Sequence, residues 1–258
     1  MDTVLEKFNE LLQIMDKLRK ECPWDKEQTF DSLRFLTIEE TYELSDAIIK
    51  QNLDEVKKEL GDLLLHIVFY SKIAEENNAF DIAGVINDIN KKLIRRHPHI
   101  FGKVKVNNAK DVMNNWEEIK LMEKGRKTVL EGVPNGLPPM VKAYRIQQKA
   151  AGVGFDWDNA EQVLEKVKEE YHELQKELQS GTAHNKLADE FGDLLFALIN
   201  YARFINVEPD EALEKTNQKF IKRFNYLEQQ TIAKGKSLRD MTLGEMDVYW
   251  EEAKNREE

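Results

Sequence analysis

Two regions of this sequence carry the same arrangement of acidic residues. Each contains the pattern E-E-x-x-E followed, after a gap, by E-x-x-D. The acids are Glu39, Glu40, Glu43, Glu59 and Asp62 in the first region, and Glu169, Glu170, Glu173, Glu190 and Asp193 in the second. Asp62 and Asp193 each lead directly into an apolar run, where a carboxylate is costly to bury unless its charge is compensated. A divalent metal ion is the simplest compensator for several converging carboxylates.

Helical spacing predicts how these acids converge. Residues three apart in a helix lie on one face, so Glu40 projects with Glu43, and Glu59 with Asp62. Two such helices packed antiparallel bring four carboxylates to one point. The second region repeats this arrangement with Glu170, Glu173, Glu190 and Asp193. Because oxygen-only ligands favour hard cations, the pattern predicts Mg²⁺, with Mn²⁺ as a substitute, rather than zinc.

Two other interpretations of these acids are solvated acidic faces and a di-iron carboxylate bundle. Solvated acidic faces are common on Glu-rich helices, but the duplicated acid before an apolar run disfavours them. A di-iron carboxylate bundle uses Glu-x-x-His pairs on two of its helices. His66 follows Asp62 by four residues, whereas Ala197 stands at the matching position of the second region. We therefore interpret His66 as a core residue or as a support for a metal ligand.

A metal held by acids needs a substrate that completes its coordination, and phosphates are the usual choice. Phosphates also attract cations, and Lys219 and Arg223 are four residues apart on one expected helix. Lys92 and Arg96 have the same spacing. An ordinary basic helix face explains each pair equally well. Trp250 is suited to stacking on a base or ribose, or to anchoring a core.

Apolar periodicity predicts an all-α protein. Apolar residues recur at i, i+3, i+4 and i+7, and alternating strand patterns are absent. Helices are expected at about 3–20, 30–50, 53–76, 81–96 and 110–124, and again at about 140–151, 159–179, 184–204, 209–231 and 242–256. The segment EGVPNGLPPM at 131–140 interrupts the two series. Since Pro and Gly stop helices, we predict an N-terminal domain at 1–130, a linker at 131–140 and a C-terminal domain at 141–258.

The two series are an internal duplication. Trp24-Asp25 precedes the first acidic helix, and Trp157-Asp158 precedes the second. Later in each half, NKKLIRR corresponds to NQKFIKR, and WEEIK corresponds to WEEAK. These matches keep their order along the chain, so each half is expected to form the same helical bundle.

Composition narrows the function classes. The chain has 258 residues, of which 33 % are charged and 41 % hydrophobic, as in a soluble helical protein. Its net charge of −10 argues against direct nucleic-acid binding. Cys22 is the single cysteine, so no intrachain disulfide forms. The N-terminus lacks the apolar core of a signal peptide and no apolar run reaches a bilayer's width, so we expect a cytoplasmic protein without membrane contact.

Five segments together resemble the MazG family of nucleoside triphosphate pyrophosphohydrolases: CPWDKEQTF, EETYEL, ELGDLLLHIVFY, RRHPHIF and GVGFDW. The resemblance covers essentially the whole chain, including the duplication. It implies two tandem MazG-like bundles with the all-α NTP pyrophosphatase fold, assembled as a homodimer. It also implies Mg²⁺-dependent hydrolysis of nucleoside triphosphates to the monophosphate and pyrophosphate, with broad base tolerance and a role in clearing the nucleotide pool.

The resemblance also assigns roles to individual residues of the second repeat. It implies that Glu170, Glu173, Glu190 and Asp193 bind the metal, and that Glu169 is a further acid near the metal or the water. It implies that Lys166, Lys186, Lys219 and Arg223 bind the substrate together with Trp250. Glu169 or Glu173 is expected to orient the attacking water. Lys219 and Arg223 are expected to stabilise charge on the leaving pyrophosphate.

The first repeat departs from this pattern. Leu36 and Glu55 stand where the second repeat has Lys166 and Lys186. We therefore expect the C-terminal domain to perform most of the chemistry. Two alternatives stay open: a narrow dUTPase or dCTPase with the same acidic helices, and a nucleotide-sensing scaffold that binds metal without turnover.

Overall fold

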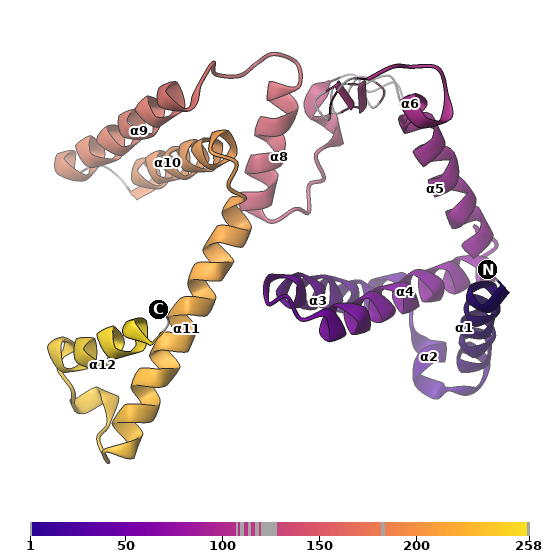
Figure 1. Ribbon diagram of the computed structural model, residues 1–258, viewed down its shortest axis with the longest axis horizontal. Helices are drawn as coiled ribbons and strands as arrows, with labels where there is room; N and C mark the ends of the chain where they lie inside the picture. The colour runs from indigo at the N-terminus through magenta and orange to yellow at the C-terminus, as the bar shows by residue number, and fades with distance from the viewer. Residues whose placement is uncertain are drawn as a thin grey trace. The chain divides into compact units, whose positions relative to one another are not determined.

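The computed structural model describes residues 2–106, 108, 111–112, 115–116, 119, 128–181 and 184–256, and within them it contains helices and no β-strand (Figure 1). The predicted all-α class is confirmed. The chain divides into two compact units, Met1–Lys120 and Leu121–Glu258. Residues 131–140 belong to the second unit, and the domain limits given above stay a prediction. No described helix has the length and apolar character needed to span a bilayer.

The first unit is built around a helical hairpin. Its described helices are α1 (Asp2–Glu21), α2 (Pro23–Glu27), α3 (Phe30–Ile49), α4 (Leu53–Glu76), α5 (Ile82–Arg96) and α6 (Pro98–Phe101). α3 and α4 lie side by side, and α1 packs against α4 (Figure 1). The core that joins these three helices contains Met15, Leu33, Val68, Phe69 and Ile73. The helix expected at 110–124 falls mostly outside the described residues.

Local signals set the limits of the hairpin helices. Thr29 and Ser32 form a capping box at the start of α3, with Thr29 Oγ1 accepting from the Ser32 amide at 3.2 Å. Asn52 Oδ1 accepts from the Glu55 amide at 3.3 Å and begins α4. Gln51, between the helices, has a φ of 55°. A connection this short makes neighbouring helices antiparallel, and this arrangement turns the acidic faces of α3 and α4 toward each other.

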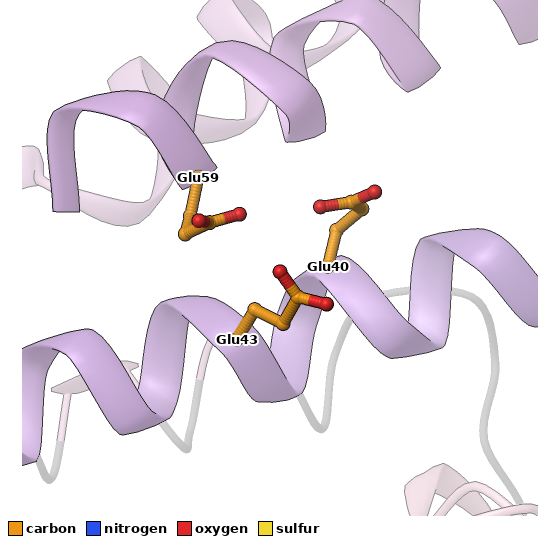
Figure 2. A group of neighbouring side chains, drawn as sticks. All are labelled: Glu40, Glu43 and Glu59. Carbon is orange, nitrogen blue, oxygen red and sulfur yellow. The ribbon is translucent and has the colours of Figure 1, made fainter. Parts of the chain in front are cut away.

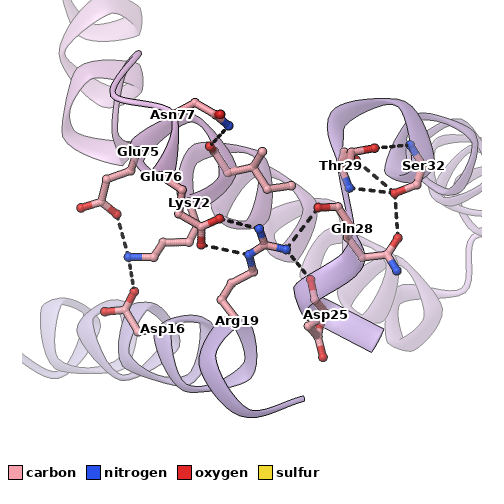
Figure 3. A network of polar contacts seen from close by, with 11 residues as sticks. Asp16, Arg19, Asp25, Gln28, Thr29, Ser32, Lys72, Glu75, Glu76 and Asn77 are labelled. Atoms are coloured by element: carbon pink, nitrogen blue, oxygen red, sulfur yellow. Dashed lines mark hydrogen bonds and ion pairs between the residues drawn. The ribbon is translucent and has the colours of Figure 1, made fainter. Parts of the chain in front are cut away.

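A buried arginine fixes α1 and α2 to the end of α4. Arg19 donates to both carboxylate oxygens of Glu76, at 3.0 and 2.5 Å, and to the backbone oxygens of Asp25 and Gln28 (Figure 3). Its side chain is 9 % exposed. The hydrogen bond from Arg19 is the largest cause that lowers the pKa of Glu76. The contacts of Arg19 therefore hold α1 and α2 against α4, in addition to the apolar core.

The second unit contains a matching hairpin. Its described elements are η2 (Val129–Gly132), α8 (Pro139–Ala151), α9 (Ala160–Ser180), α10 (His184–Phe204), α11 (Pro209–Ala233), η3 (Leu238–Asp240) and α12 (Leu243–Asn255). α9 packs along α10, and α11 packs along α12 (Figure 1). Asn159 Oδ1 caps α9 by accepting from the Gln162 amide at 3.0 Å. Leu227, Met241 and Tyr249 form the core between α11 and the segment ending in α12.

Candidate metal centres and their surroundings

The first acidic cluster consists of Glu40 and Glu43 on α3 and Glu59 on α4. Figure 2 shows the two α3 side chains projecting toward Glu59 on the facing helix. One carboxylate oxygen of each lies within 4.8 Å of the others. Asp62 is not part of this group of three. The hairpin thus brings three of the four acids expected in this repeat close enough to share one cation.

Glu59 is almost fully enclosed, with 2 % of its surface exposed. Its Oε1 accepts a hydrogen bond from Lys58 Nζ at 2.9 Å. Its Oε2 is buried and has no hydrogen-bond partner. A buried carboxylate oxygen without a partner costs free energy, and a bound cation would remove that cost.

The acids of the first cluster repel one another. Burial raises the pKa of Glu40, and the negative charges of Asp62, Glu43 and Glu59 raise it further. Asp62 therefore lies close enough to act on the cluster, although it is not within the shared 4.8 Å. A proton or a cation relieves this repulsion.

His66 lies one turn after Asp62 and points into the core. It is 8 % exposed, and its Nδ1 is 2.9 Å from Thr37 Oγ1. The Thr37 hydroxyl is in turn 2.7 Å from the Tyr70 hydroxyl. Burial lowers the pKa of His66, while the charge of Asp62 opposes that shift. These contacts place His66 in a polar network inside the hairpin, and it does not belong to the three-acid group.

The second acidic cluster consists of Glu170 on α9 and of Glu190 and Asp193 on α10, again with oxygens within 4.8 Å of one another. Glu173 is outside this group of three, yet its charge is the first of the acidic neighbours that raise the pKa of Glu190, after desolvation. The two repeats thus build similar clusters with different fourth members. Asp62 is the outlying acid in the first repeat, and Glu173 is the outlying acid in the second.

Lys166 occupies the second cluster as an internal cation. Its Nζ lies 2.8 Å from Glu169 Oε1 and 2.7 Å from Glu170 Oε1. Hydrogen bonds to Glu169 and Glu170 raise the pKa of Lys166. Lys186, in the first turn of α10, is exposed. Within the part of the chain that the structure describes, Lys166 therefore neutralises part of the cluster's negative charge from α9, the helix that also carries Glu170.

Space is left beside both E-x-x-D pairs. A Cβ built on Gly61 or Gly192 meets no atom of a neighbouring element within 4 Å. These glycines precede Asp62 and Asp193 in the middle of long helices. Close packing of another described helix therefore does not explain them, and the open space lies next to each candidate metal ligand.

The remaining expected substrate residues lie on the other helix pair. The Arg223 guanidinium is 5.8 Å from the centre of the Trp250 ring, which in turn is 5.0 Å from the Phe220 ring. Lys219 is one turn before Arg223 on α11. The duplication preserves this contact, because Arg96 lies 5.7 Å from the Trp116 ring in the first unit. Among the described residues, no hydrogen bond or ion pair connects Lys219 to the acids of α9 and α10.

Sequence reasoning did not identify the lysine of the first cluster. Lys58 is adjacent to Glu59 and also lies 3.9 Å from Glu55. Asp189 stands at the matching position of the second repeat. The first cluster therefore takes its internal cation from α4, whereas the second takes Lys166 from α9. The spacing Glu55-x-x-Lys58 is typical of an ion pair on one face of a helix. This spacing is the sequence signal that could have identified Lys58.

Comparisons with known proteins agree with this duplication. The model of the MazG nucleotide pyrophosphohydrolase domain matches residues 28–101 and again residues 158–227. These segments contain both acidic hairpins. A crystal structure of a MazG-related protein from Thermotoga maritima is 24 % identical, with a TM-score of 0.39, and covers 43 % of this chain and 97 % of that one.

Two curated proteins are similar to this chain over almost its whole length. A nucleoside triphosphate pyrophosphohydrolase/pyrophosphatase MazG of Thermotoga maritima is 46 % identical over 255 residues, covering 97 % of each protein. A nucleoside triphosphate pyrophosphohydrolase of Escherichia coli is 40 % identical over 260 residues, covering 98 % of this chain and 99 % of its own. With two domain matches and full-length relatives, this chain belongs to the MazG nucleotide pyrophosphohydrolase family.

Proposed function

We propose that this protein hydrolyses nucleoside triphosphates to the nucleoside monophosphate and pyrophosphate. The observation that carries the proposal is the coincidence of two MazG domain matches with two acidic helical hairpins. The names of the full-length relatives in Thermotoga maritima and Escherichia coli agree with it. We also propose broad base tolerance, a cytoplasmic location, and a role in clearing the nucleotide pool.

The acidic clusters fit a hard divalent cation. Each offers carboxylate oxygens only, and in the first cluster Lys58 contacts Oε1 of Glu59 while the buried Oε2 has no hydrogen-bond partner. We propose that Mg²⁺, or Mn²⁺ in its place, is held in the second repeat by Glu170, Glu173, Glu190 and Asp193. In the first repeat the corresponding ligands are Glu40, Glu43, Glu59 and Asp62. The ion would supply positive charge for the phosphates and lower the pKa of a nearby water.

The other polar residues of the second repeat then have defined tasks. Glu169 or Glu173 orients the attacking water and accepts its proton. Lys166, which is paired with Glu169 and Glu170 in the free protein, turns to the phosphates when the acids bind a cation. Lys186, Lys219 and Arg223 add positive charge for the leaving pyrophosphate. Trp250 supports Arg223 through the contact between its ring and the guanidinium.

The second repeat is proposed as the main catalytic domain. Its acids have a lysine one turn before Glu170, where the first repeat has Leu36. In the first repeat the internal cation, Lys58, is bound to Glu59, which is itself a proposed metal ligand. The first repeat is therefore expected to be weakly active or to serve as a scaffold.

Exposed apolar residues favour a homodimer. α5 exposes Ile86, Ile89, Leu93 and Ile94, and α11 exposes Phe220 and Ile221. Apolar faces of this kind are typical of association surfaces. The net charge of −10 argues against nucleic acid as a partner. We therefore propose that the protein assembles with a second copy of itself.

A pyrophosphate-release assay tests the proposal. The full-length protein is given each canonical nucleoside triphosphate, and also dUTP, with Mg²⁺, with Mn²⁺, and with a chelator. Metal-dependent release of pyrophosphate from all of them is the expected result. Release from dUTP or dCTP alone would replace it with a narrow pyrophosphatase. Binding of triphosphates without release in any metal would replace it with a nucleotide-sensing scaffold.

A further inference from the structure

The turn before α8 contains an asparagine followed by a glycine. Asn135 is the only asparagine of the chain that precedes a glycine. Leu137 N donates to Pro134 O at 3.4 Å, and this bond closes a turn with Asn135 and Gly136 at its centre. Both central residues are exposed to solvent. The turn therefore presents to water an asparagine side chain together with the main-chain N–H that follows it.

The two reacting groups of this turn are not engaged elsewhere. In the part of the chain that the structure describes, the Gly136 N–H donates to no acceptor. The side-chain amide of Asn135 has no hydrogen-bond partner among those residues either, and only its main-chain oxygen accepts a bond. A Cβ built on Gly136 meets no atom beyond its chain neighbours within 4 Å. Nothing described therefore shields the Gly136 nitrogen from the side chain of Asn135.

Lys142, in the first turns of α8, faces the peptide group that joins these residues. Its Nζ donates to the backbone oxygen of Asn135 at 2.6 Å. That oxygen shares its peptide group with the Gly136 nitrogen. If the nitrogen loses its proton, the resonance of the peptide group moves negative charge onto this oxygen. A cation that already faces the oxygen stabilises this charge where it develops.

The ammonium group of Lys142 is not committed to an acid. Across the described ranges of the chain, no ion pair includes Lys142. Lys168 of α9 shows the usual alternative, because its Nζ pairs with Glu165 at 2.7 Å. The positive charge of Lys142 is therefore directed at the Asn135 oxygen and is not matched by a carboxylate.

We propose that Asn135 is a site of spontaneous deamidation and that Lys142 accelerates the reaction. Solvent removes the Gly136 amide proton, and the nitrogen attacks Asn135 Cγ. The N–Cγ bond forms, the Cγ–Nδ2 bond breaks, and Nδ2 takes a proton from solvent and leaves as ammonia. The product is a five-membered succinimide, which water then opens. Water is the only co-reactant, and no oxidant or reductant takes part.

Lys142 also influences how the succinimide opens. Water that breaks the bond between the Gly136 nitrogen and Cγ gives aspartate. Water that breaks the bond between this nitrogen and the main-chain carbonyl carbon gives isoaspartate. Because Lys142 polarises the main-chain carbonyl group, attack at that carbon is favoured. The isoaspartate product lengthens the main chain by one methylene in the turn that leads into α8.

Timed incubation of the full-length protein in mildly alkaline buffer tests the site. Peptide mass spectrometry measures the conversion of amide to acid at each asparagine, and electron-transfer fragmentation separates aspartate from isoaspartate. We expect Asn135 to convert at least about tenfold faster than the other asparagines, because only its following residue lacks a Cβ. Gly136→Ala fits the open turn, and its methyl group should slow the conversion about tenfold by hindering the approach of the nitrogen to Cγ.

Substitutions of Lys142 test its role. Lys142→Met should slow the conversion about fivefold, the usual effect of losing one exposed hydrogen bond, and should lower the share of isoaspartate. Lys142→Arg keeps a charged donor and should retain both the rate and the share. Lys168→Met is the matched control for the loss of one lysine and should behave like wild type. Thermal melting checks that each variant is folded.

Three results would overturn the proposal. An intact Asn135 in protein whose other asparagines have converted would show that the turn is not a deamidation site. A wild-type rate in Lys142→Met would remove the role of the lysine. A slower rate with an unchanged share of isoaspartate would also remove it, because the lysine would then act on the conformation of the turn and not on the carbonyl group. No step requires triphosphate hydrolysis, so the outcome is independent of the proposed function.

Discussion

Lys166 lies one turn before Glu170 on α9, and its Nζ is 2.7 Å from that carboxylate. The same ammonium group contacts Glu169 at 2.8 Å. In the free protein, a cation therefore already sits among acids that are proposed to surround a metal and its water. Binding of a dication would release the lysine toward the phosphates, which connects metal binding to substrate binding.

Lys166→Met is predicted to impair substrate binding. A hydrogen bond involving a charged group contributes about 1.5–3 kcal/mol, so kcat/KM for ATP should fall at least about tenfold, mainly through a higher KM. Steady-state pyrophosphate release measures the change. Lys168→Met is the matched control, because Lys168 pairs with Glu165 at 2.7 Å on the same helix, away from the acids. Equal losses in both variants would contradict a specific role for Lys166.

Glu173→Ala and Glu43→Ala should differ strongly in their effects. Both acids belong to an E-E-x-x-E pattern. Only in the second repeat does a lysine stand one turn before the pattern, where Lys166 contacts Glu170. We expect Glu173→Ala to reduce pyrophosphate release by about a hundredfold or more, the usual range for a group that acts on a proton in the transition state. Glu43→Ala should retain most of the activity. Similar losses from both substitutions would show that the repeats share the chemistry.

The raised pKa of Glu40 predicts how the stability of the metal-free folded protein depends on pH. Burial and the charges of its acidic neighbours raise the pKa of Glu40 above the ordinary value of a glutamate. The folded state therefore binds more protons than the unfolded state, and stability falls as pH rises from about 4.5 through the raised pKa. In chelator, Glu40→Gln should raise the melting temperature relative to wild type, and the gain should grow from pH 4.5 to pH 7.

Added Mg²⁺ should reverse that difference. The wild-type protein gains from metal binding to the native state, whereas Glu40→Gln removes a proposed ligand. Glu39→Gln, an exposed neighbour on α3, should behave like wild type in both conditions. A melting curve of Glu40→Gln that parallels wild type at every pH would contradict the electrostatic account of this cluster.

Arg19→Met should destabilise the first unit. Arg19 makes two bonds to Glu76 and two to backbone oxygens, with its own side chain 9 % exposed. Because Glu76 is 38 % exposed and partly solvated, we expect a loss of about 2 kcal/mol in the free energy of unfolding, below the cost of a fully buried pair. Urea denaturation measures it. Lys17→Met, whose pair with Glu21 spans 3.9 Å at the surface, should cost at most about 0.5 kcal/mol.

The helices that position the acids were predictable because their apolar faces repeat over five or more turns. α4 (Leu53–Glu76) and α10 (His184–Phe204) begin and end where the sequence predicts. α2 and α6 were not predicted, since five and four residues are too few to show periodicity. The duplicated motifs match Arg96 with Arg223 and Trp116 with Trp250, but the contact between each arginine and its tryptophan was found only in the structure.

The site was less predictable than the helices. Spacing placed Glu59 and Asp62 on one face, but the rotation of α4 against α3 decided that Glu59 joins the group of three and Asp62 does not. Lys58 contacts Glu59 although adjacent residues point in different directions on a helix, because its long side chain bends back to reach the carboxylate. A cavity lined by Gln147 and Phe196 depends on the packing of α8 against α10, which one-dimensional patterns do not contain.

Gly192→Ala separates stability from function in the second repeat. A Cβ at this position meets nothing within 4 Å, so the substitution should stabilise the metal-free protein by up to about 1 kcal/mol through helix propensity. Gly61→Ala should do the same in the first repeat, where the space is equally open. If the triphosphate passes beside Asp193, only Gly192→Ala should raise KM for ATP. Melting curves in chelator and pyrophosphate release measure the two effects, and an unchanged KM in Gly192→Ala would show that substrate does not use this space.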